Sequence, residues 1–344
     1  MTRYFVAFWN LENLFAPEDF PGREPWIAEA VKNDLKGWTQ ELFDRKIFQL
    51  TSIISGMNTS KGPDLLAVCE VENKFCLEEL ALALNTLLPA RNYKVVHVDA
   101  TKDKRGIDTA FVYDGKTLTA NEQELFSHFV LRRTGTRDIT QVTFVTKPGH
   151  EFVALANHWP SRSGGHYTES QGFRMTAGET LSYWHGRILE EKGPIPVIAL
   201  GDFNDDPSSP SVMLHALALR ELDDVKGGTN PYYYNLSWNY LSQQVTASNG
   251  NKRTIYGSLY FQGDANLFDQ ILLSKPFFHG NSPIRLVDGS ARIEAPQKMV
   301  SPSKNEGPIR FGLPKGNAAA NVNRDGYSDH FPVSVELEVD DAVA

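Results

Sequence analysis

The sequence has few cysteines, no long hydrophobic run and no excess of basic residues. Its two cysteines, Cys69 and Cys76, are too few for a disulfide scaffold, and we interpret both as small core residues. No stretch is long and apolar enough to cross a membrane, and the N-terminus shows no signal-peptide pattern. We therefore expect a cytoplasmic protein, a monomer by default, without stable membrane association.

The charge balance is acidic. A net charge of −8 over 344 residues leaves no basic footprint for holding duplex nucleic acid by charge alone. A nuclease remains compatible with this balance, because metal ions supply positive charge locally at an acidic site. The hydrophobic fraction of 41% is that of a soluble globular protein with a sizeable core.

Short apolar runs rich in β-branched and aromatic residues recur along the chain, each bounded by turn residues. Some, such as 197–200, are apolar at every position, which indicates burial on both faces of a sheet. Strand length and composition predict β-strands at residues 4–9, 64–71, 93–98, 108–113, 139–145, 151–157, 195–200, 267–273 and 331–337.

Apolar residues at spacings of three and four predict helices over 43–57, 75–88 and 168–192. Strands follow one another directly in some places and are separated by helices in others, which favours a mixed sandwich of sheets covered by helices. We expect one domain over residues 1–344. The stretch 281–323 is rich in Pro, Gly, Ser, Asn and Lys, and it predicts a loop insertion within that domain.

Polar residues capable of metal or phosphate chemistry fall where the apolar runs end. Carboxylates in or beside apolar runs are costly unless they are paired or bound to metal. Taken singly, each also has a structural explanation, as a turn residue, a surface carboxylate or a packed histidine. The set comprises Asn10, Glu70, Asn157, His158, Asp202, Asn204, Asp269, Ser328, Asp329 and His330.

The order of these residues resembles the motif order of the endonuclease/exonuclease/phosphatase superfamily. The resemblance implies an α/β four-layer sandwich, in which two packed mixed β-sheets are flanked by helices and a divalent-metal site lies at one end of the sheets. The matching segments are FWNLENLF (8–15), LAVCEVEN (66–73), RGIDTA (105–110), NHWPSR (157–162), GDFN (201–204), FDQIL (268–272) and SDHFPV (328–333).

The expected chemistry is in-line attack of water on a phosphorus ester. We expect Glu70 to be the primary Mg²⁺ ligand, with Asn10 and Asp329 contributing directly or through water, and Mn²⁺ to substitute. Glu12 is equally compatible with an exposed charge at a strand end and with a residue that assists metal binding. Bringing several carboxylates together without a metal would raise the pKa of at least one of them.

By resemblance, Asp202 activates the attacking water, and Asn204 holds the phosphate or the nucleophile. Asp269 is expected to pair with His330, so that an imidazolium contacts the phosphate. His158 is expected to donate a hydrogen bond to the phosphate.

Further substrate contacts are expected from Arg162, in a glycine-rich loop, and from Arg105. Two solvated surface arginines would give the same sequence pattern. The aromatic residues within 232–261 are compatible with stacking on single-stranded bases, although packing within a hairpin explains them more simply.

The sequence is compatible with several substrate classes and functions. A nuclease acting on nucleic-acid phosphodiesters is favoured. The alternative is a phosphatase or phosphodiesterase acting on a small phosphorylated metabolite, an inositol phosphate or a phospholipid head group. The sequence shows no basic amphipathic helix for lipid and no Lys/Arg-rich patch for a polyphosphorylated ring. A non-catalytic binding scaffold is less expected, because every position of the set carries a competent residue.

Overall fold

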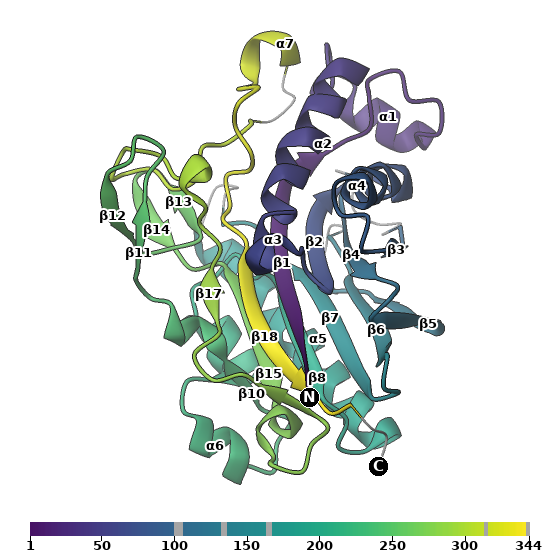
Figure 1. Cartoon of the computed structure of the whole chain (residues 1–344), viewed down its shortest axis with the longest axis vertical. Coiled ribbons are helices and arrows are strands. Elements are labelled where there is room, and N and C mark those ends of the chain that lie inside the picture. Colours follow the sequence, from purple (N-terminus) through teal and green to yellow (C-terminus); the bar gives the residue numbers. More distant parts are fainter. Residues whose placement is uncertain (100–105, 132–135, 163–166, 313–315, 342–344) are drawn as a thin grey trace.

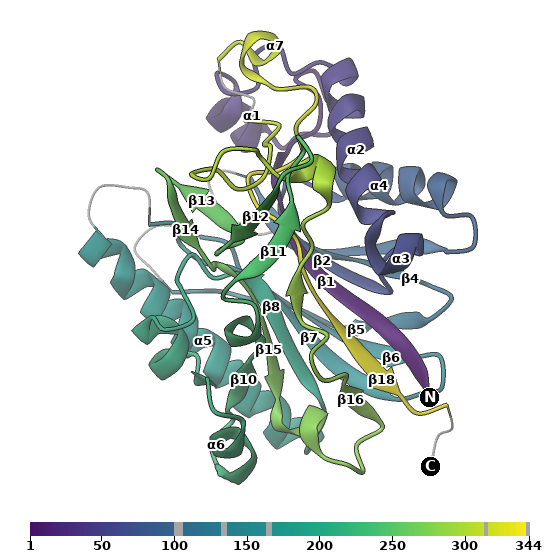
Figure 2. The same ribbon diagram turned by 60° about the vertical axis from the view of Figure 1, so that its left-hand side comes forward.

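Two seven-stranded sheets pack face to face at the centre of the computed structural model (Figures 1 and 2). The structure describes residues 1–99, 106–131, 136–162, 167–312 and 316–341. In the first sheet the order is β16-β18-β1-β2-β4-β3, with β17 beside β18. Its strands are β1 (Thr2–Leu14), β2 (Leu65–Val71), β3 (Tyr93–His97), β4 (Asp108–Asp114), β16 (Ile284–Leu286), β17 (Arg292–Ile293) and β18 (Val333–Val339).

The second sheet has the order β5-β6-β7-β8-β15-β10-β9. Its strands are β5 (Leu118–His128), β6 (Ile139–Thr146), β7 (Glu151–His158), β8 (Val197–Asp202), β9 (Ala218–Leu219), β10 (Tyr233–Asn235) and β15 (Asp269–Ser274). Two separate hairpins pair β11 (Gln243–Thr246) with β12 (Lys252–Ile255), and β13 (Leu259–Phe261) with β14 (Asp264–Asn266).

Helices cover the outer faces of both sheets. On the first sheet lie α2 (Gln40–Ile54) and α4 (Lys74–Leu87), and on the second lies α5 (Tyr167–Lys192) (Figure 2). The shorter elements are α1 (Pro25–Val31), α3 (Met57–Ser60), α6 (Leu222–Gly227), α7 (Ala318–Asn321), a π-helical turn at Ser211–His215, and 3₁₀ turns at Leu236–Asn239, Lys275–Phe278 and Gln297–Met299. Helix, sheet, sheet and helix form four layers, which confirms the expected fold class.

Local sequence explains where the covering helices begin. Thr39 caps α2, its hydroxyl accepting a hydrogen bond from the backbone N–H of Leu42, and Asn73 caps α4 in the same way. Between the sheets, the rings of Phe111 in β4 and Phe144 in β6 meet edge to face with centroids 5.5 Å apart. The core therefore holds the two sheets in a defined relative position. No helix among the residues that the structure describes is long and apolar enough to cross a membrane.

The described part of the segment 281–323 is mostly irregular, but it is not detached from the sandwich. Both β16 and β17 pair antiparallel with β18 and extend the edge of the first sheet.

Strand direction places the polar strand ends at one end of the molecule. In the first sheet β1 and β2 run parallel, and β18 runs antiparallel to β1. In the second sheet β7 and β8 run parallel, and β15 runs antiparallel to β8. The C-terminal ends of β1, β2, β7 and β8 therefore lie at the same end as the N-terminal ends of β15 and β18.

Gly201 permits close approach of β7 and β8 directly before this end. A Cβ atom at this position would lie 2.6 Å from the Cβ of Asn157 and would overlap its carbonyl oxygen. We predict that Gly201→Ala lowers the free energy of unfolding by about 1–3 kcal/mol, the usual cost of overpacking. Urea denaturation measures the loss.

Gly172 supplies the matched control. It is exposed in α5, and nothing lies within 4 Å of its Cβ position. Gly172→Ala should therefore stabilise the protein by up to about 1 kcal/mol. Equal effects of the two substitutions would show that Gly201 is not a packing constraint.

Candidate active site

In the second sheet, three of the candidate side chains share one register position. Asp202 is the cross-strand partner of His158 in β7 and of Asp269 in β15. The three residues therefore lie side by side, and each is buried.

In the first sheet, Asn10 lies where the regular pairing of β1 with β2 breaks, and Glu70 lies next to the last residue of β2. The turn before β18 is fixed against β1, because the Trp9 indole Nε1 donates to the His330 carbonyl at 2.7 Å. The Ser328 hydroxyl donates to the Asn10 carbonyl at 2.7 Å. These bonds hold the 328–330 turn beside Trp9 and Asn10 of β1.

The two groups meet across the interface between the sheets. Asn10 Nδ2 donates to Asp202 Oδ2 at 3.2 Å. His158 Nε2 lies 3.5 Å from Glu70 Oε1 and 3.7 Å from Asp202 Oδ2. The structure thus gathers eight of the expected residues at one site: Asn10, Glu70, His158, Asp202, Asn204, Asp269, Asp329 and His330.

Two of these side chains project from residues with left-handed backbone conformations. Glu70 has φ +60° at a bulge that interrupts the pairing of β2 with β4, and Asn204 has φ +49°. The Asn204 backbone N–H donates to Asp202 Oδ1 at 2.9 Å, and its Nδ2 donates to the Trp159 carbonyl at 3.0 Å. Such left-handed conformations cost free energy in residues other than glycine and are concentrated at functional sites.

Asp269 and His330 form the expected pair. His330 Nδ1 lies 2.8 Å from Asp269 Oδ2, which also accepts a hydrogen bond from the Ser258 hydroxyl. Although burial opposes protonation, the carboxylates of Asp269, Asp202 and Asp329 hold the pKa of His330 well above its ordinary value. His330 is therefore an imidazolium whose Nε2–H faces the site, 3.9 Å from Asp202 Oδ2 and 3.9 Å from Asp329 Oδ1.

The site carries more negative charge than its own cations neutralise. Burial, with the charges of Asp269 and Glu70, raises the pKa of Asp202 to about 6 despite His330. Burial and the charges of Glu12 and Glu70 raise the pKa of Asp329 to about 7. An oxygen-rich cluster with raised carboxyl pKa values fits a hard divalent cation such as Mg²⁺, with Glu70, Asp329 and the amide of Asn10 as available ligands.

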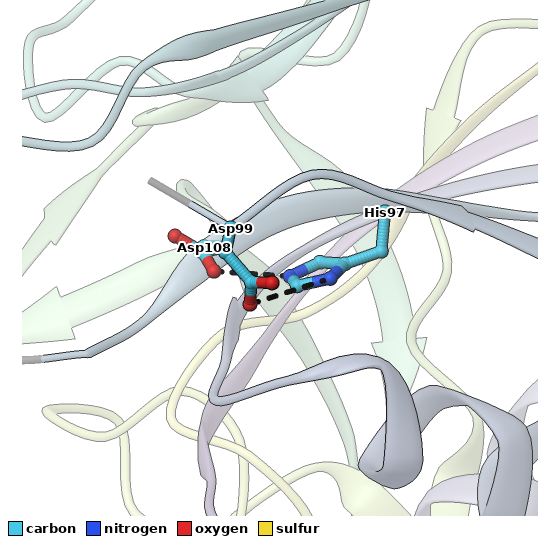
Figure 3. Close-up of side chains that lie close together, drawn as sticks. All are labelled: His97, Asp99 and Asp108. Carbon is cyan, nitrogen blue, oxygen red and sulfur yellow. Dashed lines mark hydrogen bonds and ion pairs between the residues drawn. The ribbon is translucent and has the colours of Figure 1, made fainter. Parts of the chain in front are cut away.

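A second group of acidic residues lies at the start of β4. In the parts of the chain that the structure describes, His97, Asp99 and Asp108 are the one group of three His, Cys, Asp or Glu residues whose ligand atoms all lie within 4.8 Å of one another. Asp108 Oδ2 is 3.0 Å from His97 Nε2, whereas Asp99 Oδ1 is 3.8 Å from Nδ1 (Figure 3). Because the carboxylates contact opposite nitrogens of one ring, they suit a doubly paired histidine better than a shared metal ion.

Sequence reasoning did not identify Arg137, which contacts His158. The buried Arg137 Nε donates to His158 Nδ1 at 3.1 Å. An arginine N–H can only donate, so Nδ1 is the acceptor and the ring proton of His158 lies on Nε2, toward Glu70 and Asp202. His158 is therefore oriented as a donor to a substrate oxygen. Nothing local in the sequence distinguishes Arg137 from its neighbouring arginines.

The other expected residues have different surroundings. Arg162 bonds to the carboxylates of Asp205 and Asp206 at 2.8 and 3.0 Å and stacks on the Phe268 ring. Its guanidinium is therefore held by acidic neighbours beside the GDFN motif. Arg105 lies outside the described residues.

Glu12 does not contact the expected metal ligands through its carboxylate. The carboxylate is buried, and it accepts hydrogen bonds from Arg310 Nε at 2.7 Å and from the backbone N–H groups of Phe311 and Gly312 at 3.1 and 3.0 Å. Glu12 thus holds the segment around Arg310 against the site.

Comparison with known proteins agrees with this geometry. A family profile described as Endonuclease/Exonuclease/phosphatase family matches residues 5–339. The chain belongs to the endonuclease/exonuclease/phosphatase family. It is accordingly a phosphoester hydrolase of a family that uses divalent metal ions. No curated protein shows a significant match to the sequence.

Solved structures of this family share the fold at low sequence identity. An endonuclease/exonuclease/phosphatase family protein from Bacteroides thetaiotaomicron is 15% identical, with 98% of each chain covered and a TM-score of 0.52. A mannosyl-6-phosphatase from the same organism is 16% identical, with 97% of this chain and 99% of that chain covered and a TM-score of 0.53. Truncated TDP2 from Caenorhabditis elegans is 14% identical, with 98% of each chain covered and a TM-score of 0.50.

The Asp269–His330 pair predicts non-additive kinetics. Asp269→Asn should reproduce much of the His330→Ala defect in kcat, because both changes disturb the charge and orientation of one imidazole. The double variant should be little worse than the worse single variant. A double-mutant cycle on kcat tests this, and losses that multiply fully would show that the two residues act independently.

Proposed function

We propose that this family member hydrolyses phosphodiester bonds in nucleic acid with Mg²⁺, by in-line attack of an activated water. The observation that carries the proposal is the single site where Glu70, Asp202 and His330 meet at the joined ends of two sheets. A bound Mg²⁺ would supply charge neutralisation and polarisation of a phosphate oxygen. Mn²⁺ is expected to substitute for it.

The chain's own residues cover the remaining needs of the reaction. Asp202 is oriented by Asn10 Nδ2 and by the Asn204 backbone N–H, so its carboxylate is placed to accept a proton from the attacking water. His330 presents an Nε2–H that carries positive charge, and His158 presents a neutral one. Both are donors to phosphate oxygens, whose negative charge develops during the displacement.

Exposed aromatic rings on the segment that leads into and forms β13 support a nucleic-acid substrate. The β13–β14 hairpin borders the site, since Leu259 bridges to His330 and the Phe331 N–H donates to the Ser258 carbonyl at 2.7 Å. Tyr256, between β12 and β13, is 59% exposed, and Phe261, at the end of β13, is 54% exposed. Rings at such positions can stack on the bases of a flexible strand.

The same aromatic stretch also contains packed residues. Tyr233 and Tyr240 are buried, and burial raises the pKa of Tyr240 above its ordinary value. Packing therefore explains the buried aromatic residues of this stretch. Stacking on substrate is proposed only for the exposed rings.

A small phosphorylated metabolite is the second candidate substrate. The net charge of −8 disfavours a long polyanion. A protein of the same fold has the name mannosyl-6-phosphatase, which makes a sugar phosphate a reasonable member of the test set.

The substrate panel comprises plasmid DNA, single-stranded DNA, RNA, bis-p-nitrophenyl phosphate, inositol phosphates and mannose 6-phosphate, each with Mg²⁺, Mn²⁺ or EDTA. We predict turnover of nucleic acid with either metal and none with EDTA after metal has been stripped. Hydrolysis of phosphomonoesters alone would replace the nuclease assignment with a phosphatase. Full activity in EDTA would contradict metal dependence.

A paired variant tests the role of the exposed rings in the same panel. Tyr256→Ala combined with Phe261→Ala should raise KM for single-stranded DNA or RNA about tenfold, because stacking is worth about 1–3 kcal/mol per base. Tyr183→Ala, at an equally exposed ring on α5, is the matched control and should leave KM unchanged. Equal KM values for both variants would remove the hairpin from substrate binding.

A further inference from the structure

Arg310 places its guanidinium between two carboxylates at the edge of the site. Its Nε donates to Glu12 Oε1 at 2.7 Å, and its Nη2 lies 3.5 Å from Asp329 Oδ2. Asp329 directly precedes His330, so the guanidinium lies beside the group expected to bind the metal and the phosphate. The segment 281–323, which the sequence suggests is only an insertion, supplies this charge.

Buried partners hold the anchor of Arg310 in place. The side chain of Glu12 is inaccessible to solvent, and Lys46 Nζ, also buried, lies 3.6 Å from Glu12 Oε2. The same ammonium donates to the carbonyls of Glu12 and Tyr327 at 3.2 and 3.1 Å and lies 4.9 Å from the centre of the Phe311 ring. Glu12 is therefore a fixed acceptor and not a mobile surface charge.

The backbone of Arg310 is positioned just as closely. Gly326 lies against it, and a Cβ at position 326 would overlap the Arg310 carbonyl group. Two backbone hydrogen bonds flank the contact, from Tyr327 N to the Ile309 carbonyl at 2.8 Å and from Asn323 N to the Phe311 carbonyl at 2.7 Å. The chain leading to Asp329 and the chain carrying Arg310 thus form one unit.

One edge of the guanidinium has no protein partner among the described residues. The Arg310 side chain is 52% exposed, and within the described ranges its Nη1 donates to no protein group. Arginine has donors in a planar fork that matches phosphate oxygens. Because the Arg310 guanidinium is held at Nε and has an unused donor at Nη1 among the described residues, it can bind an anion with little loss of side-chain freedom.

We propose that Arg310 binds a non-bridging oxygen of the substrate phosphate, beside the group held by His158 and His330. The inference rests on the proposed function only in that the substrate is a phosphoester, and it holds equally for a diester or a monoester. Arg310 thereby gives the 281–323 segment a part in substrate recognition.

Binding of inorganic phosphate to the Mg²⁺-loaded full chain, measured by calorimetry, tests the proposal without any turnover. Arg310→Met should weaken phosphate binding about 10- to 100-fold, the range for loss of one charge-assisted hydrogen bond. Arg310→Lys keeps the charge without the fork, and it should show a smaller loss of severalfold. Mn²⁺ affinity should be unchanged or tighter in Arg310→Met, because a cation beside Asp329 is removed.

Arg324 provides the matched control. It is 50% exposed and forms an ion pair with Glu41, so Arg324→Met should leave phosphate binding unchanged. The proposal is overturned if wild-type protein does not bind phosphate, or if folded Arg310→Met binds it as wild type does. If Arg310→Met does not fold, wild-type affinity in Arg310→Lys overturns it. Failure to cleave nucleic acid alters none of these outcomes, so the two proposals fail separately.

Discussion

The hydrogen bond between Asn10 and Asp202 joins the ends of the two sheets, and the chemistry of the site depends on that junction. Asn10 lies where the regular pairing of β1 with β2 breaks in one sheet, and Asp202 ends β8 in the other. Each sheet alone would carry only some of the site residues. Register within the sheets and packing between them, rather than any local motif, therefore create the site.

The junction concentrates negative charge that the protein alone does not balance. The pKa values of Asp202 and Asp329 are raised to about 6 and about 7, because burial and neighbouring carboxylates disfavour the ionised forms when no cation is bound. Buried carboxylates and left-handed conformations at Glu70 and Asn204 both cost folding free energy. Such costs are typical of sites organised around a ligand, and a divalent cation would offset the electrostatic part.

Sequence alone predicted the core strands and most of the site, because apolar runs with polar ends are local features. The strand β5 was not among the predicted strands. Residues 118–128 form an edge strand that is largely polar, so it shows little apolar periodicity. The contact of Asp269 with His330 was anticipated through family resemblance, since the two residues lie on separate strands.

Residues whose role depends on distant contacts were beyond sequence reasoning. Arg137 meets His158 only because β6 and β7 are neighbours, and Arg310 reaches Asp329 only because Gly326 lets two loop segments touch. Arg162 lies beside Asp205 and Asp206, and its contact with substrate stays a prediction. Charge alone does not show which partners an arginine meets in the fold.

The location of a bound ion tests the central claim most directly. Crystals grown with Mn²⁺ should show an anomalous scattering peak between Glu70 and Asp329, at the joined ends of the two sheets. The His97, Asp99 and Asp108 group offers an internal alternative within the same molecule. A peak at that group alone, with none at Glu70, would contradict the assignment of the active site.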